Sequence, residues 1–214
     1  MAMSETTPRK FRRRAEARPD ELLDAVLDLF IEKGFAATRV EDIASRAGLS
    51  KGAVYLYYES KEAILEALVR RGVVPIVSSV AEMGHAALPD PRTALEMAIG
   101  QVAQRMSDPR IAAIPRIILA EAGRYPHLAE MYREEVLSVA FAAVRRMIES
   151  GIEKGVLRPV DPELAIRSVV GPLIAHVLLA RIFGIESDAS PQTFIRSHLD
   201  ILFKGLLAPE MSHD

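Results

Sequence analysis

Lysine and tyrosine side chains cluster in one short segment of the chain. Lys51, Gly52 and Ala53 are followed closely by Tyr55 and Tyr57, and three of the five tyrosines in the 214-residue chain lie within residues 55–58. A helix that reads DNA needs a slim N-terminus that enters the major groove, polar tips that reach base edges, and hydroxyl or ammonium groups for phosphates. A core helix this short would seldom carry three tyrosines, so the composition favours a nucleic-acid surface.

A second short helix is predicted just before this segment, over residues 39–46, with the tyrosine-rich helix over residues 51–58. Thr38 and Glu41 have the spacing of a capping box that starts the first of the two helices. Gly48 lies between them and permits the positive φ of a tight turn. The pattern predicts a helix-turn-helix, and an ordinary corner between two core helices is the alternative that spacing alone leaves open.

Helix signals dominate the rest of the chain. An aspartate or serine precedes a proline at four places, where the side chain can cap a helix whose first residue is the proline. These pairs are Asp90-Pro91, Asp108-Pro109, Asp161-Pro162 and Ser190-Pro191. No run of alternating β-branched residues competes with them, so the sequence predicts an all-α fold. The predicted helices cover residues 19–33, 39–46, 51–58, 61–83, 91–106, 109–123, 127–153, 162–183 and 192–207, with a bend near Gly72 and Pro75 in the fourth.

The composition excludes several kinds of active site. The chain lacks cysteine, and no two of its five histidines are three or four residues apart, as a paired metal site on a helix requires. No nucleophile elbow, phosphate-binding loop or dinucleotide fingerprint occurs. The sequence therefore predicts no catalytic residue, no metal site and no cofactor. The alternatives to a DNA-binding protein are a helical protein-interaction or small-molecule-binding protein, or an enzyme whose site is assembled from scattered residues.

The overall charge does not by itself indicate nucleic-acid binding. The chain has 27 Lys and Arg residues against 29 Asp and Glu, which gives a net charge of −2 at pH 7, so any DNA contact must come from a local arrangement. The segment from Arg9 to Arg14 is almost entirely basic. It is expected to be either a flexible arm that follows DNA phosphates or a solvated tail.

No membrane segment or secretory signal is recognised in the sequence. The longest apolar stretch, residues 169–180, is shorter than the ~20 residues of a membrane span. The N-terminal residues are polar and then basic, without the apolar core of a signal peptide. These features predict a cytoplasmic protein that has no membrane partner.

The motifs of the first third of the chain occur in a familiar order. They are Gly34-Phe35, Thr38, Val40, Ile43-Ala44, Ala47-Gly48-Leu49-Ser50, Gly52, Tyr55, Tyr57-Tyr58, Ser60-Lys61-Glu62 and Leu65. In this order and spacing, residues 25–68 resemble the TetR/AcrR family of bacterial transcriptional regulators, apart from Val54 where leucine is usual and Tyr58 where phenylalanine is usual. The resemblance implies phosphate contacts by Thr38, Tyr55, Tyr57 and Lys61, and base-edge positions for Arg39, Lys51, Gly52 and Ala53.

The resemblance also implies how the chain is organised. Residues 1–18 would form a basic flexible arm, residues 19–62 a DNA-binding head of three helices, and residues 63–214 a helical ligand-binding and dimerisation domain. In relatives, helices such as 162–183 and 192–207 pair with their copies in a homodimer. The implied function is a ligand-responsive regulator, a repressor that binds a pseudo-palindromic operator in double-stranded DNA as a dimer and is released by a small-molecule effector.

Four polar residues within apolar helices are candidates for the effector pocket: Gln101, Arg116, Glu121 and His176. Arg116 stands among isoleucines, where it can pair either with an anionic group of a ligand or with Glu121 of the same chain. For all four residues the alternative is an ordinary core or interface group with its hydrogen bonds satisfied, or a side chain that is simply exposed to solvent. The expected effector is an apolar small molecule, either neutral or acidic.

Overall fold

The computed structural model describes residues 9–85, 90–185 and 187–206. The regular elements of these residues are all helical, which confirms the all-α prediction. They are α1 (Arg9–Lys33), α2 (Val40–Ala47), α3 (Lys51–Tyr57), α4 (Lys61–Gly72), α5 (Val74–His85), α6 (Pro91–Met106), α7 (Pro109–Glu121), α8 (Pro126–Tyr132), the π-helical turn η1 (Arg133–Leu137), α9 (Ser138–Glu153), α10 (Pro162–Ile182) and α11 (Pro191–Leu206).

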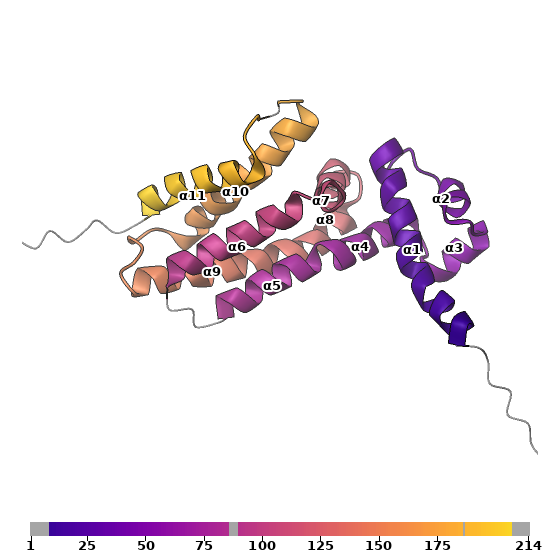
Figure 1. Ribbon diagram of the computed structural model, residues 1–214, viewed down its shortest axis with the longest axis horizontal. Coiled ribbons are helices and arrows are strands. Elements are labelled where there is room, and N and C mark those ends of the chain that lie inside the picture. The colour runs from indigo at the N-terminus through magenta and orange to yellow at the C-terminus, as the bar shows by residue number, and fades with distance from the viewer. Residues whose placement is uncertain (1–8, 86–89, 186, 207–214) are drawn as a thin grey trace, which may run out of the picture.

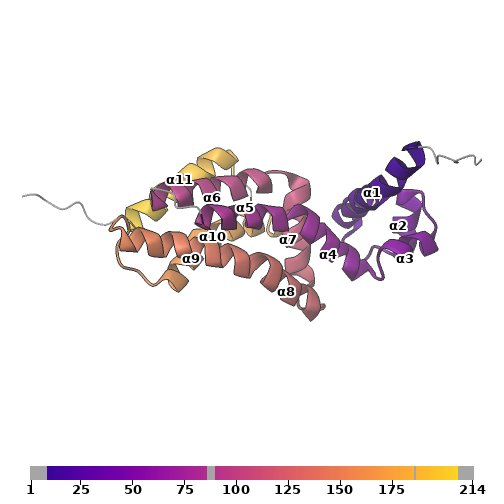
Figure 2. The same ribbon diagram turned by 90° about the horizontal axis from the view of Figure 1, so that it is seen from below.

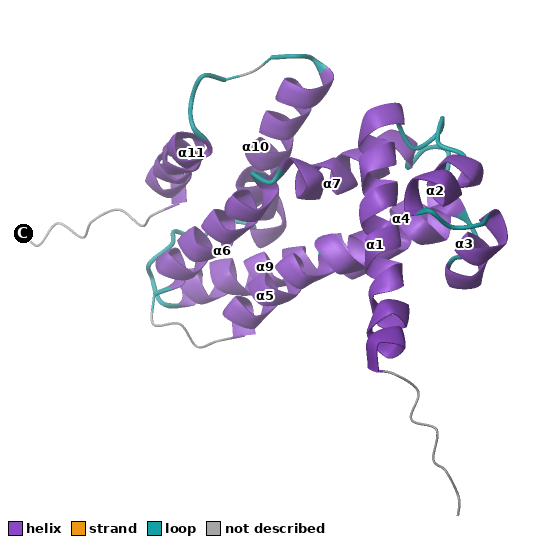
Figure 3. Ribbon diagram, turned by 45° about the vertical axis from the view of Figure 1, so that its right-hand side comes forward, coloured by secondary structure: helices purple, strands orange, loops and turns teal. Residues whose placement is uncertain are grey.

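The helices form a small head and a larger body. Helices α1, α2 and α3 make up the head at one end of the molecule, and α5 to α11 make up the body (Figure 1). Helix α4 runs from the head into the body (Figure 2). Helices α10 and α11 lie on the side of the body away from α2 and α3 (Figure 3).

The head encloses an apolar core that continues into the body. Val26 of α1, Ile43 of α2, Val54 of α3 and Leu65 of α4 are all buried. They belong to one cluster with Ile114 of α7 and other apolar residues of α7 and α8. Because apolar burial is the main favourable term in folding, this shared core fixes the head on the body rather than leaving it on a tether.

Most of the predicted helix signals act as expected. Gly48 follows α2 with a φ of 64°, which places it in the left-handed region that the turn requires. The Ser50 hydroxyl oxygen accepts the N–H of Ala53 at 3.1 Å and so caps α3. The side chains that cap α6, α7, α10 and α11 are Asp90, Asp108, Asp161 and Ser190, as the sequence predicts.

Two predicted helix starts are wrong. Helix α1 begins at Arg9 instead of near Pro19, so the part of the basic arm that the structure describes is helical; residues 1–8 lie outside the described residues. Arginine, alanine and glutamate are good helix formers, and they outweigh the one hydrogen bond that Pro19 removes. Helix α2 is capped at Arg39, whose N–H donates to the Asp42 carboxylate at 3.0 Å, so the expected Thr38 cap lies one residue too early.

The predicted bend between the head and the body is a break between two helices. Helix α4 ends at Gly72, and α5 begins at Val74 with Pro75 in its first turn. A Cβ at Gly72 would lie 2.8 Å from Cδ1 of Ile114, so α4 and α7 approach closely at this point. The break between α4 and α5 therefore lies directly against α7.

Helix α10 extends the apolar stretch considered above. Its residues 162–180 have a mean hydropathy of 1.6, which is long and apolar enough to cross a membrane by length and composition alone. The sequence analysis considered only residues 169–180 and was therefore wrong to treat the apolar segment as too short to cross a membrane. Apolar side chains of α10 are exposed, among them Leu164 at 63%, and such a face requires a partner of some kind.

Candidate functional site

Helix α3 presents most of its side chains to solvent. Val54 is 1% exposed and anchors the helix in the head core, whereas Tyr55 and Tyr57 are 46% and 38% exposed. Lys51 and Gly52 in the first turn are also exposed, and Ala53 is half-buried. The tyrosine and lysine tips thus lie on an outer face of the head, as contact with a polyanion requires.

Leu56 belongs to the same face, and the sequence analysis missed it. Its side chain is 85% exposed, more than that of any other large apolar residue among those described. A leucine at this degree of exposure near the end of a short helix gains nothing from core packing. Apolar side chains in the major groove contact thymine methyl groups, so Leu56 is a candidate base contact. The sequence could have indicated this exposure. Leu56 lies two positions after the core residue Val54, and residues two apart lie on nearly opposite sides of a helix.

Lys51 carries an ion pair with the preceding helix. Its Nζ donates to the Glu41 carboxylate of α2 at 2.5 Å, and both side chains are more than half exposed. This hydrogen bond raises the pKa of Lys51 and lowers the pKa of Glu41. Lys51 is therefore fully charged at neutral pH, and Glu41 holds its ammonium group next to the first turn of α3.

Thr38 does not present its hydroxyl to solvent. The residue is 2% exposed, and its Oγ1 donates to the backbone carbonyl of Gly34 at 2.7 Å. The hydroxyl therefore holds the connection between α1 and α2. This placement does not fit the phosphate contact that the resemblance implies for the Thr38 side chain. Arg39, the next residue, is exposed.

Lys61 is also turned toward the protein. Its Nζ donates to the carbonyls of Phe35 at 2.7 Å, Thr38 at 3.1 Å and Ala36 at 3.3 Å. It also lies 4.4 Å from the centre of the Phe35 ring, a cation–π contact. Burial lowers the pKa of Lys61. All three donors of the ammonium group are thus occupied, so the expected phosphate contact gives way to a tie between α4 and the α1–α2 connection.

The body contains an apolar cavity of about 200 Å³. Its wall is formed by α5 to α10 together with the π-helical turn η1, and every described lining residue is apolar except Arg116 and Tyr132. π-Helical turns are rare and are frequent at functional sites. Here the wide turn adds Val136 and Leu137 to the same wall. An apolar cleft or cavity with a few polar groups is the usual form of a small-molecule site.

The cavity includes one of the four predicted ligand residues. Arg116 lines it, whereas Gln101, Glu121 and His176 do not. Gln101 donates from Nε2 to the Ser79 hydroxyl at 2.9 Å, and the His176 ring stacks on Phe194 at 4.1 Å. These two side chains therefore make contacts between helices of the body, although the Gln101 Oε1 is buried without a hydrogen-bond partner among the described residues. Tyr132 is the polar wall residue that the sequence analysis missed.

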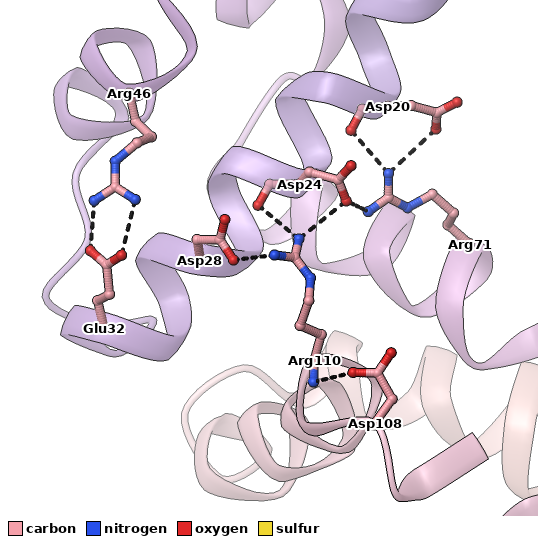
Figure 4. A network of polar contacts seen from close by, with 8 residues as sticks. All are labelled: Asp20, Asp24, Asp28, Glu32, Arg46, Arg71, Asp108 and Arg110. Carbon is pink, nitrogen blue, oxygen red and sulfur yellow. Dashed lines mark hydrogen bonds and ion pairs between the residues drawn. The ribbon is translucent and has the colours of Figure 1, made fainter. Parts of the chain in front are cut away.

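Ion pairs join the head to the body close to this cavity. Figure 4 shows Arg71 of α4 and Arg110 of α7 directed at Asp20, Asp24 and Asp28, which lie on one face of α1. Arg110 donates to the carboxylates of both Asp24 and Asp28. Further along, α7 lines the cavity at Arg116. One helix therefore contacts the head at its start and the cavity at its middle.

The fold and these two sites define a class of protein: a helical regulator with a DNA-reading head and a ligand-binding body. Residues 22–68 match the family model of the bacterial regulatory proteins of the tetR family, and residues 89–187 match that of the tetracyclin repressor-like C-terminal domain. Together the two segments cover more than half of the chain. The chain belongs to the TetR family of bacterial regulatory proteins. It is a ligand-responsive DNA-binding transcriptional regulator and not an enzyme.

Several bacterial regulators resemble the chain along most of its length. It is 28% identical over 197 residues to the HTH-type transcriptional repressor KstR2 of Rhodococcus jostii (strain RHA1), a match that covers 90% of this chain and 92% of KstR2. The regulator PfmR of Thermus thermophilus has a similar structure, with a TM-score of 0.69 and 26% identity over 87% of this chain and 99% of PfmR. FadR of Bacillus subtilis, solved with stearoyl-CoA, shares the fold, with a TM-score of 0.68 and 21% identity over 86% of this chain and 97% of FadR.

Proposed function

We propose that two copies of this chain bind a pseudo-palindromic operator in the cytoplasm and repress transcription until a small molecule enters the body cavity. The observation that carries the proposal is the outer face of α3, where Lys51, Tyr55, Leu56 and Tyr57 are exposed together. A single helix of this length covers few base pairs, so useful specificity needs two half-sites and hence two heads. The relative KstR2 is named a repressor, which supports repression rather than activation.

An exposed apolar face on α10 and α11 supports the homodimer. Leu164, Leu179 and Phe183 follow α10 to its C-terminal end, and Ile201 lies on α11. These side chains are 43% to 69% exposed. An apolar surface of this kind marks an interface, and a twofold axis would bury it against its own copy. The same pairing accounts for the long apolar α10 without a membrane.

Helix α7 supports a route from the cavity to the head. Effector binding changes the DNA affinity only if the effector binds more tightly to one arrangement of the heads than to the other. Arg116 of α7 lines the cavity, and Arg110 at the start of α7 holds α1 through Asp24 and Asp28. A shift of α7 around a bound ligand therefore moves α1 and the attached α2 and α3. The close approach of α4 to α7 at Gly72 gives the shift a second path to the head.

The test is operator binding by the full-length protein. Fluorescence anisotropy with a duplex from upstream of the protein's own coding region, against a scrambled duplex of equal length, should show sequence-selective and salt-dependent binding. Lys51→Ala should weaken selective binding and alter the base preference. Arg105→Ala, an exposed residue at the end of α6, is the matched control and should bind as the parent does. Equal binding of the two duplexes by the parent would sink the proposal.

A further inference from the structure

The cavity wall carries two polar side chains that have no partner. Arg116 lies on α7 and Tyr132 at the end of α8, and the other wall residues that the structure describes are apolar. Within the residues that the structure describes, neither the Arg116 guanidinium nor the Tyr132 hydroxyl has a hydrogen bond or ion pair. The pairing of Arg116 with Glu121, which the sequence left open, is not formed. Both side chains are half-buried, and without a partner from the described residues both are available to a ligand.

Both groups act as donors at neutral pH. The guanidinium of arginine is always protonated in proteins and presents a planar fork that matches a carboxylate. Burial raises the pKa of Tyr132 to about 12, so its phenol keeps the proton and can donate it to an oxygen. In an apolar surrounding a charge-assisted hydrogen bond is stronger than in water. The wall therefore suits a negatively charged oxygen group attached to an apolar body.

The size and charge of the wall limit the ligand further. A cavity of about 200 Å³ is somewhat larger than the engineered apolar cavity of ~150 Å³ that binds benzene. It suits an apolar body of roughly eight to ten carbons by that comparison. Among the wall residues that the structure describes, Arg116 is the one cationic side chain. A single guanidinium matches one carboxylate, whereas the several phosphates of a coenzyme A thioester need several cations.

We propose that the effector is an amphipathic monocarboxylic acid, with its apolar body in the cavity and its carboxylate bound by Arg116 and Tyr132. This inference rests on the proposed function, because it takes the cavity to be the effector site. It separates this chain from FadR of Bacillus subtilis, which was solved with an acyl-coenzyme A. It also assigns the polar recognition to the wall formed by α7 and α8.

The test uses three probes that share one apolar chain: octanoate, 1-octanol and octanoyl-coenzyme A. Isothermal titration calorimetry on the full-length protein should show octanoate binding about tenfold or more tightly than 1-octanol, as expected for a charged hydrogen bond. Arg116→Met should remove this preference and leave 1-octanol binding within about twofold, because the methionine keeps the apolar contacts. Tyr132→Phe should weaken octanoate binding about tenfold, the effect of one hydrogen bond to a charged group.

Control variants keep the outcome clear. Arg105→Met, outside the cavity, should bind all probes as the parent does. Arg116→Lys keeps the positive charge and should bind octanoate more tightly than Arg116→Met. Unchanged binding of 1-octanol shows that each variant is folded. The proposal is overturned if 1-octanol binds as tightly as octanoate, if Arg116→Met keeps the preference, if octanoyl-coenzyme A binds most tightly, or if none of the probes binds.

Operator anisotropy separates this inference from the function on which it rests. Selective operator binding that octanoate does not release, combined with a lack of octanoate binding, would overturn the effector class and leave the DNA-binding proposal in place. Octanoate binding by a protein that does not distinguish operator from scrambled DNA would have the opposite meaning. In that case the cavity would be an acid-binding site of a protein without the proposed function.

Discussion

The guanidinium of Arg110, in the first turn of α7, donates to the carboxylate of Asp24 in α1 at 3.2 Å. The same carboxylate accepts from Arg71 of α4 at 2.7 Å. The two helices that connect the body with the head therefore meet on one side chain of the head. Asp108 caps α7 by accepting the N–H of Arg110 at 2.8 Å, which fixes the start of that helix.

Arg110→Gln is expected to weaken the response to effector more than it weakens DNA binding. The substitution removes the ion pairs with Asp24 and Asp28, so a shift of α7 is passed less effectively to α1. A saturating effector lowers operator affinity by a coupling factor, which is usually ~5- to 150-fold. In Arg110→Gln this factor should be about threefold or more smaller than in the parent. Operator titrations with and without effector measure it. Arg133→Gln, whose pairs lie within its own helical segment, should leave the response unchanged.

Lys61→Met is expected to reduce stability rather than the salt dependence of DNA binding. The change leaves three backbone carbonyls without their charged donor, which should cost about 1–2 kcal/mol in the free energy of unfolding. Urea denaturation followed by circular dichroism measures this loss. Lys51→Met is the matched variant: it should leave the unfolding free energy nearly unchanged and flatten the salt dependence of operator binding. A flatter salt dependence in Lys61→Met would restore the phosphate contact that the resemblance implies.

Leu56→Asn is expected to weaken operator binding about tenfold and to reduce the preference for thymine at one position of each half-site. Because Leu56 is 85% exposed, the melting temperature should stay within about 1 °C of the parent. Anisotropy with a set of single-base operator variants measures the preference. Met97→Asn, which changes another exposed apolar side chain on α6, should have no effect on DNA binding. Leu56 has no role in reading bases if the two variants behave alike.

Ile201→Glu is expected to convert the dimer to monomer. Ile201 is 69% exposed on α11, so the monomer should keep its fold, whereas the dimer would have to bury two unpaired carboxylates. Dimerisation should weaken by about 2 kcal/mol or more. Sedimentation velocity over a concentration series measures the change. Met97→Glu on α6 serves as the control, and a dimer that persists in Ile201→Glu would place the interface elsewhere.

The partly buried Tyr132 should make stability depend on pH between about pH 10 and 12. Burial raises its pKa from 10.0 to about 12 in the folded protein, so the unfolded chain loses the phenol proton first. The stabilising contribution is complete below pH 10 and is lost as the pH rises toward 12. When the pH rises from 9 to 11, the unfolding free energy should therefore fall by about 1 kcal/mol less in Tyr132→Phe than in the parent. Equal losses in urea denaturation would show that the phenol is not buried.

The helices could be predicted from the sequence because their signals are local. Asp90, Asp108 and Asp161 cap helices that start at the next residue, and each signal needs only a few neighbouring residues. The errors at Pro19 and Thr38 have a local cause as well. Good helix formers before Pro19 extend α1 past the proline, and the Asp42 carboxylate moves the cap of α2 from Thr38 to Arg39.

The functional side chains were harder to predict than the helices. The exposed tyrosines of α3 could be recognised because a short helix has little core to offer them. The contacts of Lys61 could not be predicted, because its ammonium group binds the carbonyl of Phe35, which is 26 residues away in the chain. Arg116 was recognised as a charge among isoleucines. Tyr132 was missed because its direction depends on the π-helical turn that follows it.

That turn gives the family a simple way to change what the body recognises. A π-helical turn equals one residue inserted into an α-helix, and each residue of an α-helix turns the chain by about 100°. A relative that lacks one residue between Arg133 and Leu137 would keep α9 in place and rotate α8 about its axis. A different side chain would then replace the phenol in the wall, without any substitution at the cavity itself. Chemical selectivity in such proteins can thus diverge through a single-codon deletion.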